Sequence, residues 1–515
     1  MVILSFLIQF LSLLNKINLA TASAIKRAKE VGVRKIVGAS KSQIVVQFIF
    51  ETAIIVTFSI LFALAIVELS LPFFNDFLNK KLTMNGNEFY LQIILIFGVV
   101  IVCAGIFPAI YIANFETLKV LKGNFSRSKS GIWIRNSMLV SQFAIATFFI
   151  VGALIVYSQV DYMMNKDLGF KGDQVIKIAL YRQDRETKIA KYETTKQELL
   201  KIPGVKQVST LEGTLGGGLT STSGFTHNGI FVQASNGFVD FDFLKMMKIK
   251  IVEGRDLSPE FASDTVSNML MNETCVKFLN IKNPINTIVN SGWGDEIVGN
   301  KKFKIVGVVK DFNVTGFQDK IPPMVFAHIK AMKFRNFQYV YVKVNPENLT
   351  EVLPKIEEYW AKNVNSEYPF DFEFIDKAFA KTYLEQVKQK DLFFVLNLIV
   401  IVIAVFGLFA LASFSMERRL REIAIRKTLG AETNVLLKEL SKQYVMFCLL
   451  GFLIGIFPAY ILLQKWLEDF VYRIDIGVFP FAVALIALLF LTLTIVLAKA
   501  YLVSKIDVLK YLKYE

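Results

Sequence analysis

Side chains that carry acid–base, nucleophilic or metal chemistry are few in this sequence, and their spacing suits none of these reactions. The two histidines, His227 and His328, lie about a hundred residues apart with no cysteine beside either, so neither has the spacing of a metal ligand. Each is expected to be a surface or core histidine. The sequence has no H-E-x-x-H motif and no convincing pair of carboxylates, although groups distant in sequence can meet in a fold.

Phosphate and thiol chemistry are equally poorly represented. The segment TLGGGLTSTSG at 214–224 is rich in Gly and Ser but lacks the Lys-Ser/Thr ending of a P-loop, so it is predicted to be a flexible loop. No Walker A sequence occurs. Cys103 and Cys448 lie inside apolar runs, which leaves Cys275 alone in the large polar segment without a disulfide partner. We therefore expect a non-catalytic chain that holds no metal and binds no cofactor directly.

The composition indicates an integral membrane protein. Of the 515 residues, 54% are hydrophobic and 20% are charged, with a mean hydropathy of +0.46, whereas soluble domains carry about 25% charged residues. The net charge of +14 suits either nucleic-acid binding or a topology that keeps Lys and Arg in the cytoplasm. The positions of the basic residues distinguish the two.

Apolar runs long enough to cross about 30 Å of hydrocarbon, which takes about 20 helical residues, occur six times. A seventh run, residues 1–14, is short and precedes a cleavage-like Ala22-Ser23-Ala24, but it lacks the basic n-region of a signal peptide. We interpret it as the tail of a spanning helix whose beginning is missing from this chain. The six predicted spans are residues 44–74, 89–113, 137–160, 391–415, 440–464 and 477–503.

Alternation of the spans sorts the charges. Counting the first apolar run as a span places residues 15–43, 114–136, 416–439 and 504–515 on one side, with about 21 Lys and Arg against about 8 Asp and Glu. The short loops on the other side are close to neutral. The basic side is therefore predicted to be cytoplasmic. This distribution leaves little charge for nucleic-acid binding, which we exclude.

The large polar insert, residues 161–390, falls on the outer side and has a mixed α/β pattern. Helical periodicity occurs at 185–202 and 347–364. Strand-like runs occur at DQVIKIAL (173–180), KFKIVGVVKDF (302–312) and FQYVYVKV (337–344).

A basic segment, KRAKEVGVRKIVGAS (26–40), is predicted to form a short amphipathic helix. Lys26, Lys29 and Arg34 flank an apolar stripe, and Glu30 can pair with Lys26 or Arg34 four residues away. Gly38 suits the left-handed residue that ends a helix, and Ser40-Lys41-Ser42-Gln43 fits a capping box that starts the next one. The stripe consists of Val33, Ile36 and Val37.

The same plan returns 392 residues later as RRLREIAIRKTLGAE (418–432). Here Ile425 and Leu429 form the stripe and Gly430 ends it, while Arg418, Arg419, Arg421, Arg426 and Lys427 carry the charge. ETLKVLK (116–122) and DVLKYLK (507–513) match at an offset of 391. The chain is therefore predicted to contain an internal repeat of a membrane unit. An interfacial helix lying on anionic lipid is the alternative for each basic segment.

KEVGVRKIVGAS, REIAIRKTLGA and IVGVVKDFN (305–313) resemble the FtsX-like and MacB-like permeases of ABC transporters, above all the large two-module permeases of the Bacteroidetes type. The resemblance covers essentially the whole chain. It implies a polytopic α-helical membrane protein with a mixed α/β periplasmic domain and two repeated FtsX-like membrane modules. Two positions depart from the pattern: Ala424 stands where the first copy has Gly32, and Glu432 where it has Ser40. A two-module permease would also have a further span and a first periplasmic domain.

The resemblance divides the chain as follows: 1–14, a partial transmembrane helix; 15–43, a cytoplasmic coupling helix; 44–113, two helices of the first module; 114–136, a cytoplasmic linker; 137–160, a transmembrane helix and stem; 161–390, the MacB-like periplasmic core domain; 391–415, a transmembrane helix; 416–439, the second coupling helix; 440–503, two helices of the second module; and 504–515, a cytoplasmic tail.

The resemblance implies a type VII permease of the inner membrane. A separate cytoplasmic ATPase dimer would bind ATP and Mg²⁺, and stem helices near 151–166 and 379–394 would carry motion to the periplasmic domain, for export or extraction of a peptide, lipoprotein or antibiotic. A periplasmic or outer-membrane partner is a further expectation. The ATPase-coupling residues would be Lys26, Arg27, Glu30, Arg34, Lys35, Gly38, Arg418, Arg419, Glu422, Arg426, Lys427 and Gly430.

Two other functions remain open. A regulator of a cell-wall hydrolase would share the family and the architecture, and only the outer domain separates it from a transporter. A secondary transporter would need ionisable residues at mid-membrane. Glu51 and Glu68 are the visible candidates, but they lie near opposite ends of their predicted span, which favours interfacial placement.

Overall fold

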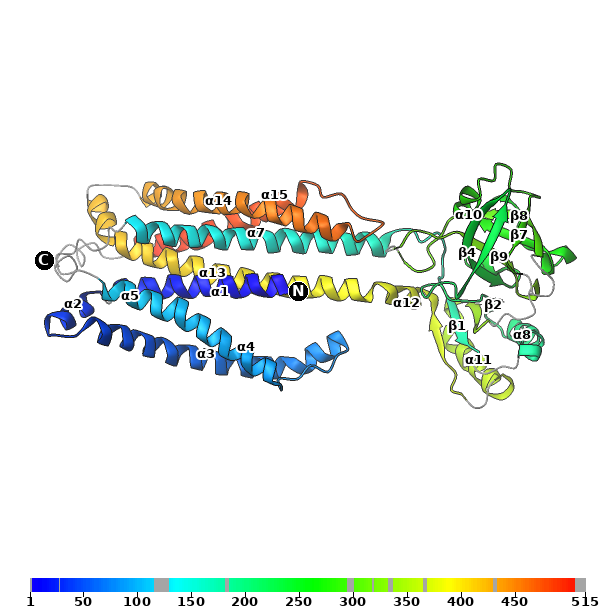
Figure 1. Ribbon diagram of the computed structural model, residues 1–515, viewed down its shortest axis with the longest axis horizontal. Coiled ribbons are helices and arrows are strands. Elements are labelled where there is room, and N and C mark those ends of the chain that lie inside the picture. Colours follow the sequence, from blue (N-terminus) through cyan, green and yellow to red (C-terminus); the bar gives the residue numbers. More distant parts are fainter. Residues whose placement is uncertain are drawn as a thin grey trace. The chain divides into compact units, whose positions relative to one another are not determined.

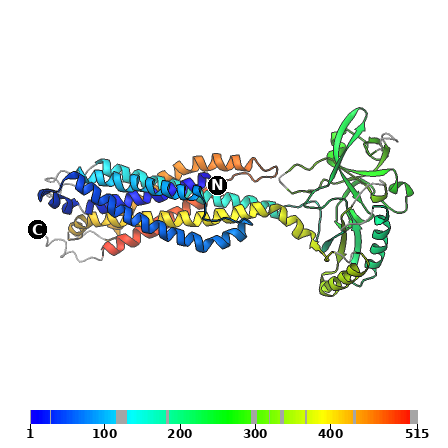
Figure 2. The same cartoon turned by 60° about the horizontal axis from the view of Figure 1, so that its bottom comes forward.

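The computed structural model describes residues 2–26, 28–114, 129–180, 185–293, 301–316, 319–331, 337–364, 368–428 and 433–504, and divides the chain into two compact units. The helical unit comprises Met1–Gln159, Lys388–Trp466 and Asp475–Glu515. The α/β unit comprises Val160–Val387 and Leu467–Ile474. Figures 1 and 2 show the long helices of the first and the sheets of the second.

Six helices among the described residues are long and apolar enough to cross a membrane, one at each of the six predicted spans. The shorter apolar helix α1 (Val2–Lys26) contains the predicted seventh run and continues past residue 14. The six are α3 (Lys41–Leu78), α4 (Asn87–Val100) continuing through α5 (Phe107–Ala113), α7 (Lys129–Asn165), α13 (Leu384–Thr428), α14 (Thr433–Leu467) and α15 (Phe479–Ser504).

The two copies of the repeat have related helices with local differences. In the first copy, the basic segment includes a separate helix, α2 (Ala28–Ile36). In the second, α13 runs without a break from its apolar part into the basic residues. A π-helical stretch (Ile101–Ile106) interrupts the last span of the first copy, whereas α15 is α-helical throughout. There the backbone of Gly105 lies against the Thr52 side chain of α3.

Helices α7 and α14 pack backbone to backbone in the helical unit. A Cβ added at Gly451 would lie 2.4 Å from the Cβ of Phe143, and one at Gly455 would lie 2.5 Å from the carbonyl oxygen of Ala144. Gly451 and Gly455 are four residues apart, the G-x-x-x-G spacing that lets transmembrane helices approach closely. These two glycines therefore set the distance between α7 and α14.

The α/β unit contains a four-stranded antiparallel sheet in the order β11-β1-β10-β2. Helices α8 (Arg185–Leu200) and α11 (Leu349–Asn363) contribute Tyr192, Leu199, Val352, Ile356 and Trp360 to its core. The strands are β1 (Val175–Ala179), β2 (Val205–Thr210), β10 (Tyr339–Val344) and β11 (Phe372–Phe374).

A second, mixed sheet has the order β5-β8-β6-β9-β4-β3-β7, and an additional β7–β8 pairing closes it into a barrel. The pairs β4–β9 and β6–β8 are parallel. Phe225, Phe238 and Phe303 surround Trp293 in its interior. The strands are β3 (Ser221–His227), β4 (Ile230–Val239), β5 (Ile251–Gly254), β6 (Asn268–Asn272), β7 (Ile288–Ser291), β8 (Lys301–Val309) and β9 (Met324–His328).

The α/β prediction for the polar insert is confirmed, with one correction. The predicted strands and helices appear as β1, β8, β10, α8 and α11. The flexible loop predicted at 214–224 is wrong over 221–224, which belong to β3 and pair with β4. Hydrogen bonds also fix the backbone at the glycine-rich start of this segment: Gly216 N donates to Val314 O at 2.7 Å, and Tyr341 Oη donates to the preceding Gly213 O at 3.2 Å.

We predict that Gly455→Leu separates α14 from α7, because the added side chain meets backbone instead of a movable side chain. The expected loss of stability is about 1–3 kcal/mol, measured by thermal unfolding in detergent. The buried Cys448 thiol, two turns earlier on α14, should react faster with a maleimide. Gly98→Leu is the matched control, since open space surrounds that helical glycine. Equal effects of the two substitutions would contradict the close α7–α14 contact.

Candidate functional site

The first basic segment ends in a turn that the sequence encodes locally. Gly38 adopts a left-handed φ of +101°, and Ala39 N donates to Arg34 O at 2.9 Å, which ends α2. Ser40 then caps α3: Gln43 N donates to Ser40 Oγ at 3.2 Å, and Ser40 N donates to Gln43 Oε1 at 2.9 Å. The predicted glycine turn and capping box are therefore both present.

Helix α2 packs on its own module through one side only. Val31 is buried against Ile44 of α3 and Ala113 of α5. The stripe predicted from the sequence faces away from this contact: Val33, Ile36 and Val37 are 53%, 63% and 82% exposed. We call these three side chains the apolar ridge. Among the described residues of the helical unit, nothing covers it.

Arg34 links the turn to α3. Its guanidinium donates to Glu30 Oε1 at 2.6 Å and to the side-chain oxygen of Gln47. Gln47 Nε2 in turn donates to Glu51 Oε1 at 3.1 Å. Glu51, a candidate for transporter chemistry in the sequence, thus belongs to a hydrogen-bond chain that begins at the basic helix. Lys35 points another way, and its Nζ donates to Ala113 O, the last carbonyl of α5, at 2.8 Å.

The second basic segment repeats the Arg34 contact at equivalent positions. Arg426 pairs with Glu439 Oε2 at 2.5 Å, and both residues lie 392 positions after Arg34 and Gln47. Ile425 beside it is 43% exposed. Of the other predicted coupling residues, Arg27 and Gly430 lie outside the described residues, as do the side chains of Lys26, Arg418, Arg419, Glu422 and Lys427.

A second region of interest lies where the chain enters and leaves the α/β unit. We call it the neck: residues 168–172 after α7, residues 311–314 after β8, and residues 375–383, which contain α12 (Ile375–Ala380). Phe170 contacts Phe312 and Phe379, with ring centroids 6.4 and 5.4 Å apart. Asn313 N donates to Leu168 O at 2.9 Å. The KDFN motif at 310–313 thus joins the barrel to the end of α7.

Asp311 of this motif also anchors the barrel's helix α10 (Glu273–Phe278). Its carboxylate accepts from Thr274 Oγ1 at 2.7 Å, Thr274 N at 3.1 Å and Asn272 Nδ2 at 2.7 Å. An acidic side chain at a helix N-terminus satisfies otherwise orphaned N–H groups. Within this short segment, Asp311 therefore binds the barrel helix α10, while the next residue, Phe312, packs in the neck.

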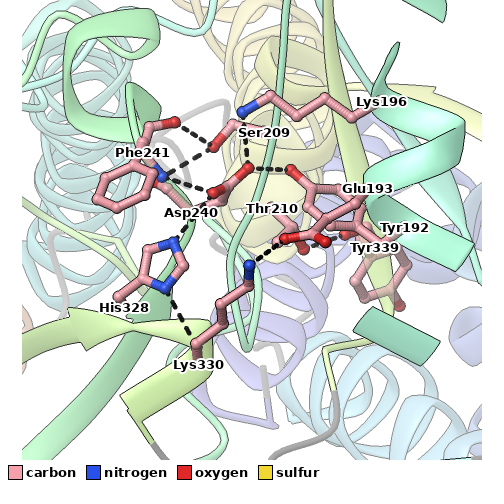
Figure 3. Close-up of polar contacts among 10 residues, drawn as sticks. All are labelled: Tyr192, Glu193, Lys196, Ser209, Thr210, Asp240, Phe241, His328, Lys330 and Tyr339. Atoms are coloured by element: carbon pink, nitrogen blue, oxygen red, sulfur yellow. Dashed lines mark hydrogen bonds and ion pairs between the residues drawn. The ribbon is translucent and has the colours of Figure 1, made fainter. Parts of the chain in front are cut away.

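A buried polar cluster joins the barrel to the four-stranded sheet with its helices α8 and α11, which we call the sheet lobe (Figure 3). Asp240, at the end of β4, accepts from Tyr192 Oη at 2.6 Å and Lys196 Nζ at 2.8 Å, both on α8. Lys330 N donates to His328 Nδ1 at 3.2 Å, so Nε2 carries the proton that reaches Asp240 Oδ1, 3.2 Å away. His328 is 2% exposed, and the expectation of a core or surface histidine is confirmed as a core one.

The electrostatics of this cluster favour a charged Asp240. Burial opposes ionisation, but hydrogen bonds from His328, Lys196 and Tyr192 outweigh it and hold the pKa of the Asp240 carboxyl well below its usual range. Burial and the neighbouring carboxylate raise the pKa of Tyr192 well above its usual range. Every member has a partner and the imidazole is buried, so the cluster stabilises the junction and gives no substrate access.

The described residues contain no group of three or more His, Cys, Asp or Glu side chains that could hold a metal ion. What the geometry offers is mechanical: an exposed ridge at one turn, long helices, and an aromatic neck. Comparison with known proteins identifies the family. The FtsX-like permease C-terminal model matches twice, at 2–117 and 394–508, and the MacB-like periplasmic core domain model matches 142–359.

The chain is a MacB/FtsX-like ABC transporter permease.

Two solved structures are similar to the α/β part of this permease. The periplasmic region of MacB from Actinobacillus actinomycetemcomitans is 13% identical and gives a TM-score of 0.32, covering 43% of this chain and 97% of that one. The extracellular domain of the noncanonic ABC-type transporter YknZ from Gram-positive bacteria is 12% identical with a TM-score of 0.29, covering 38% and 99%. No curated protein sequence matches the chain.

The family matches confirm the predicted fold class, since the FtsX-like model falls on both copies of the repeat and the MacB-like model falls between them. The permease is thus an inner-membrane, multi-pass protein. Three features were not predicted: the Gln47 and Glu439 contacts, the Gly451/Gly455 packing, and the Asp240 cluster. The Gly451/Gly455 packing could have been predicted, because G-x-x-x-G in an apolar run is a known sequence signal for close helix packing. The Asp240 cluster could not, because it joins residues far apart in the sequence.

Gly169 tests the packing of the permease's neck. It has a left-handed φ of +83°, and an added Cβ would lie 2.8 Å from Phe312 Cβ. We expect Gly169→Ala to destabilise the neck by about 2–4 kcal/mol, the sum of a left-handed alanine and an overpacked contact. Limited proteolysis near residue 169 measures this. Gly229→Ala is the control, because it has φ +79° and open space; if both variants are cleaved equally, the contact with Phe312 is unimportant.

Asp240→Asn should loosen the junction between the lobes. Its pKa is lower when folded than the ordinary 3.8, so the carboxylate contributes stability above about pH 3.8 and loses that contribution as pH falls below it. Because charge-assisted hydrogen bonds become neutral ones, we expect a loss of about 2 kcal/mol at pH 7, seen as faster hydrogen exchange in β4 and β9. Glu198→Gln removes an exposed ion pair with Lys201 at the end of α8 and should cost under about 1 kcal/mol. Similar exchange rates in the two variants would contradict the buried charge network.

Proposed function

We propose that this permease couples ATP hydrolysis by a separate cytoplasmic ATPase dimer to work done by its periplasmic domain. One observation carries the proposal: the apolar ridge of Val33, Ile36 and Val37 is exposed beside Arg34, at the turn between α2 and α3. Contiguous exposed apolar side chains with a charged rim are typical of a docking surface. The family supports an ABC ATPase as the partner.

The ridge suits a protein groove better than lipid. A helix lying on a bilayer buries its apolar face and spreads its cations around it, yet here Lys35 and Arg34 are tied to Ala113, Glu30 and Gln47 of the permease itself. The duplication supports the same conclusion, because two basic turns suit the two subunits of an ATPase dimer. In the second turn, Ile425 and Arg426 would make the corresponding contact.

Long helices give the ATPase a route to the periplasmic domain. Helix α13 has 45 residues, a length of about 68 Å, against about 30 Å of hydrocarbon. It begins at Leu384, next to the neck, and runs without a break into the second basic segment as far as Thr428. Helix α7, with 37 residues, ends three residues before the neck. Both therefore continue beyond the bilayer and act as the stems.

At the neck, a displaced stem meets tightly packed groups. Phe379 and Tyr383, with ring centroids 5.7 Å apart, precede α13, and Phe379 packs on Phe170 after α7. Because such packing resists compression, relative movement of the stems would be passed to the KDFN segment and the barrel. ATP and Mg²⁺ would be held by the partner ATPase. The work would serve export or extraction of a peptide, lipoprotein or antibiotic from the membrane or periplasm.

Co-purification from membranes tests the docking surface. We expect Val33→Ser, Ile36→Ser and Val37→Ser together to weaken ATPase binding by ten-fold or more, since burial of each side chain is worth about 1 kcal/mol or above. The charge reversals Arg34→Glu and Arg426→Glu should reduce ATPase stimulation. Phe231→Ser, which removes an exposed phenylalanine of the α/β unit, is the control and should leave binding unchanged. If the triple variant retains the ATPase with unchanged affinity, the ridge is not the docking surface.

A further inference from the structure

The hydrogen-bond chain at the first basic turn has four members in a fixed order. Glu30 and Arg34 are on α2, and Gln47 and Glu51 are on α3. Gln47 is the central member, because its oxygen accepts from Arg34 while its amide nitrogen donates to Glu51 at 3.1 Å. The Arg34 side chain is therefore held across the turn by a neutral amide, with the carboxylate of Glu51 one helical turn further along α3.

The second copy contains the same four residue types with two of them exchanged. Adding 392 to the first set gives Glu422, Arg426, Glu439 and Gln443. Arg426 meets Glu439 directly at 2.5 Å. The carboxylate thus lies where the first copy has its amide, and the amide lies where the first copy has its carboxylate. Each copy has one arginine, one glutamine and two glutamates. The exchange of glutamine and glutamate therefore moves one carboxylate by a helical turn and does not change the net charge.

This exchange alters how firmly each arginine is tied to the helix that follows it: Arg34, which also pairs with Glu30 on its own helix, meets an amide on α3, whereas Arg426 meets a carboxylate on α14. A guanidinium bonds a carboxylate more strongly than a neutral amide. Both Arg34 and Arg426 are about two-fifths exposed, so solvent reduces the difference to that of a surface ion pair, a factor of about two to five. In the sequence the two segments are otherwise equivalent, since each places its arginine beside an apolar stripe.

We propose that Gln47–Glu51 and Glu439–Gln443 are positioning pairs that give the two coupling arginines different roles. Arg426, clamped by Glu439, keeps one orientation and anchors the second module on its ATPase subunit. Arg34, held across the turn by Gln47, exchanges that contact for an acidic group of the other ATPase subunit when the dimer closes. The inference rests on the proposed function and adds to it a division of labour between the modules.

Reciprocal exchanges in the full-length chain test the inference. Gln47→Glu with Glu51→Gln gives the first copy the arrangement of the second, and Glu439→Gln with Gln443→Glu does the reverse. Each double variant keeps the composition and the net charge of the wild type. The measurements, in nanodiscs, are the Kd for the ABC ATPase that co-purifies with the wild-type chain and the kcat of stimulated ATP hydrolysis.

We expect the first exchange to lower kcat two- to five-fold with Kd unchanged, because a clamped Arg34 is slower to leave its pair. The second should raise Kd two- to five-fold with kcat largely retained, because Arg426 loses its anchor. The quadruple variant again has one arginine clamped by a carboxylate and one held by an amide. It should therefore recover most of the wild-type kcat and most of the wild-type affinity for the ATPase. A merely structural role would give losses that add up in the quadruple variant instead of cancelling.

Two results would overturn the inference. Additive losses in the quadruple variant would do so, as would Kd and kcat values within 1.5-fold of the wild type for both double variants. If the wild-type chain brings down no ATPase, the proposed function fails and this inference fails with it. If the wild type binds its ATPase and the exchanges have no effect, the inference alone is wrong. Cys448 reactivity serves as the folding control for every variant, since its thiol is buried in α14.

Discussion

The reversal of the chain at Gly38 is the constraint on which the arrangement of the first module depends. A helix that continued from α2 into α3 would carry its cations and its apolar ridge along one axis toward the bilayer. The left-handed residue stops it, and Ser40 and Gln43 satisfy the backbone donors with which the next helix starts. Because Val31 then packs on Ile44 and Ala113, the opposite side of α2, with Val33, Ile36 and Val37, is left exposed.

The periplasmic domain is organised around the two points at which the chain crosses the neck. β1 begins just after the first crossing and β11 ends just before the second, and the two strands pair directly, with Ile176 opposite Phe374. The entering and leaving chains are therefore hydrogen-bonded neighbours in one sheet. Tyr192 and Lys196 then tie that sheet's helix α8 to Asp240 and the barrel, so both parts of the domain are linked to each other as well as to the neck.

Local features were predictable from the sequence and long-range ones were not. The spans followed from hydropathy, and the turn at Gly38 and the cap at Ser40 followed from residue types within four positions of each other. β3 was missed because Ser221–Gly224 has no apolar alternation, and its partner β4 stabilises it. The contacts of Arg34 with Gln47 and of Asp240 with His328 depend on helix and strand placement that composition does not encode. Recognition of the repeat would still have aligned Gln47 with Glu439.

Strand β8 has a mechanical consequence for the barrel. It pairs with β5, β6 and β7 along its length, and it leads directly into the KDFN segment at the neck. A force applied at Phe312 therefore reaches the barrel through β8, and any part of it along the strand axis loads many interstrand hydrogen bonds at once, in shear. An edge strand peeled from one end would break its bonds one after another under a much smaller force. The closed ring of strands lets the barrel move as a rigid load when the neck is pulled.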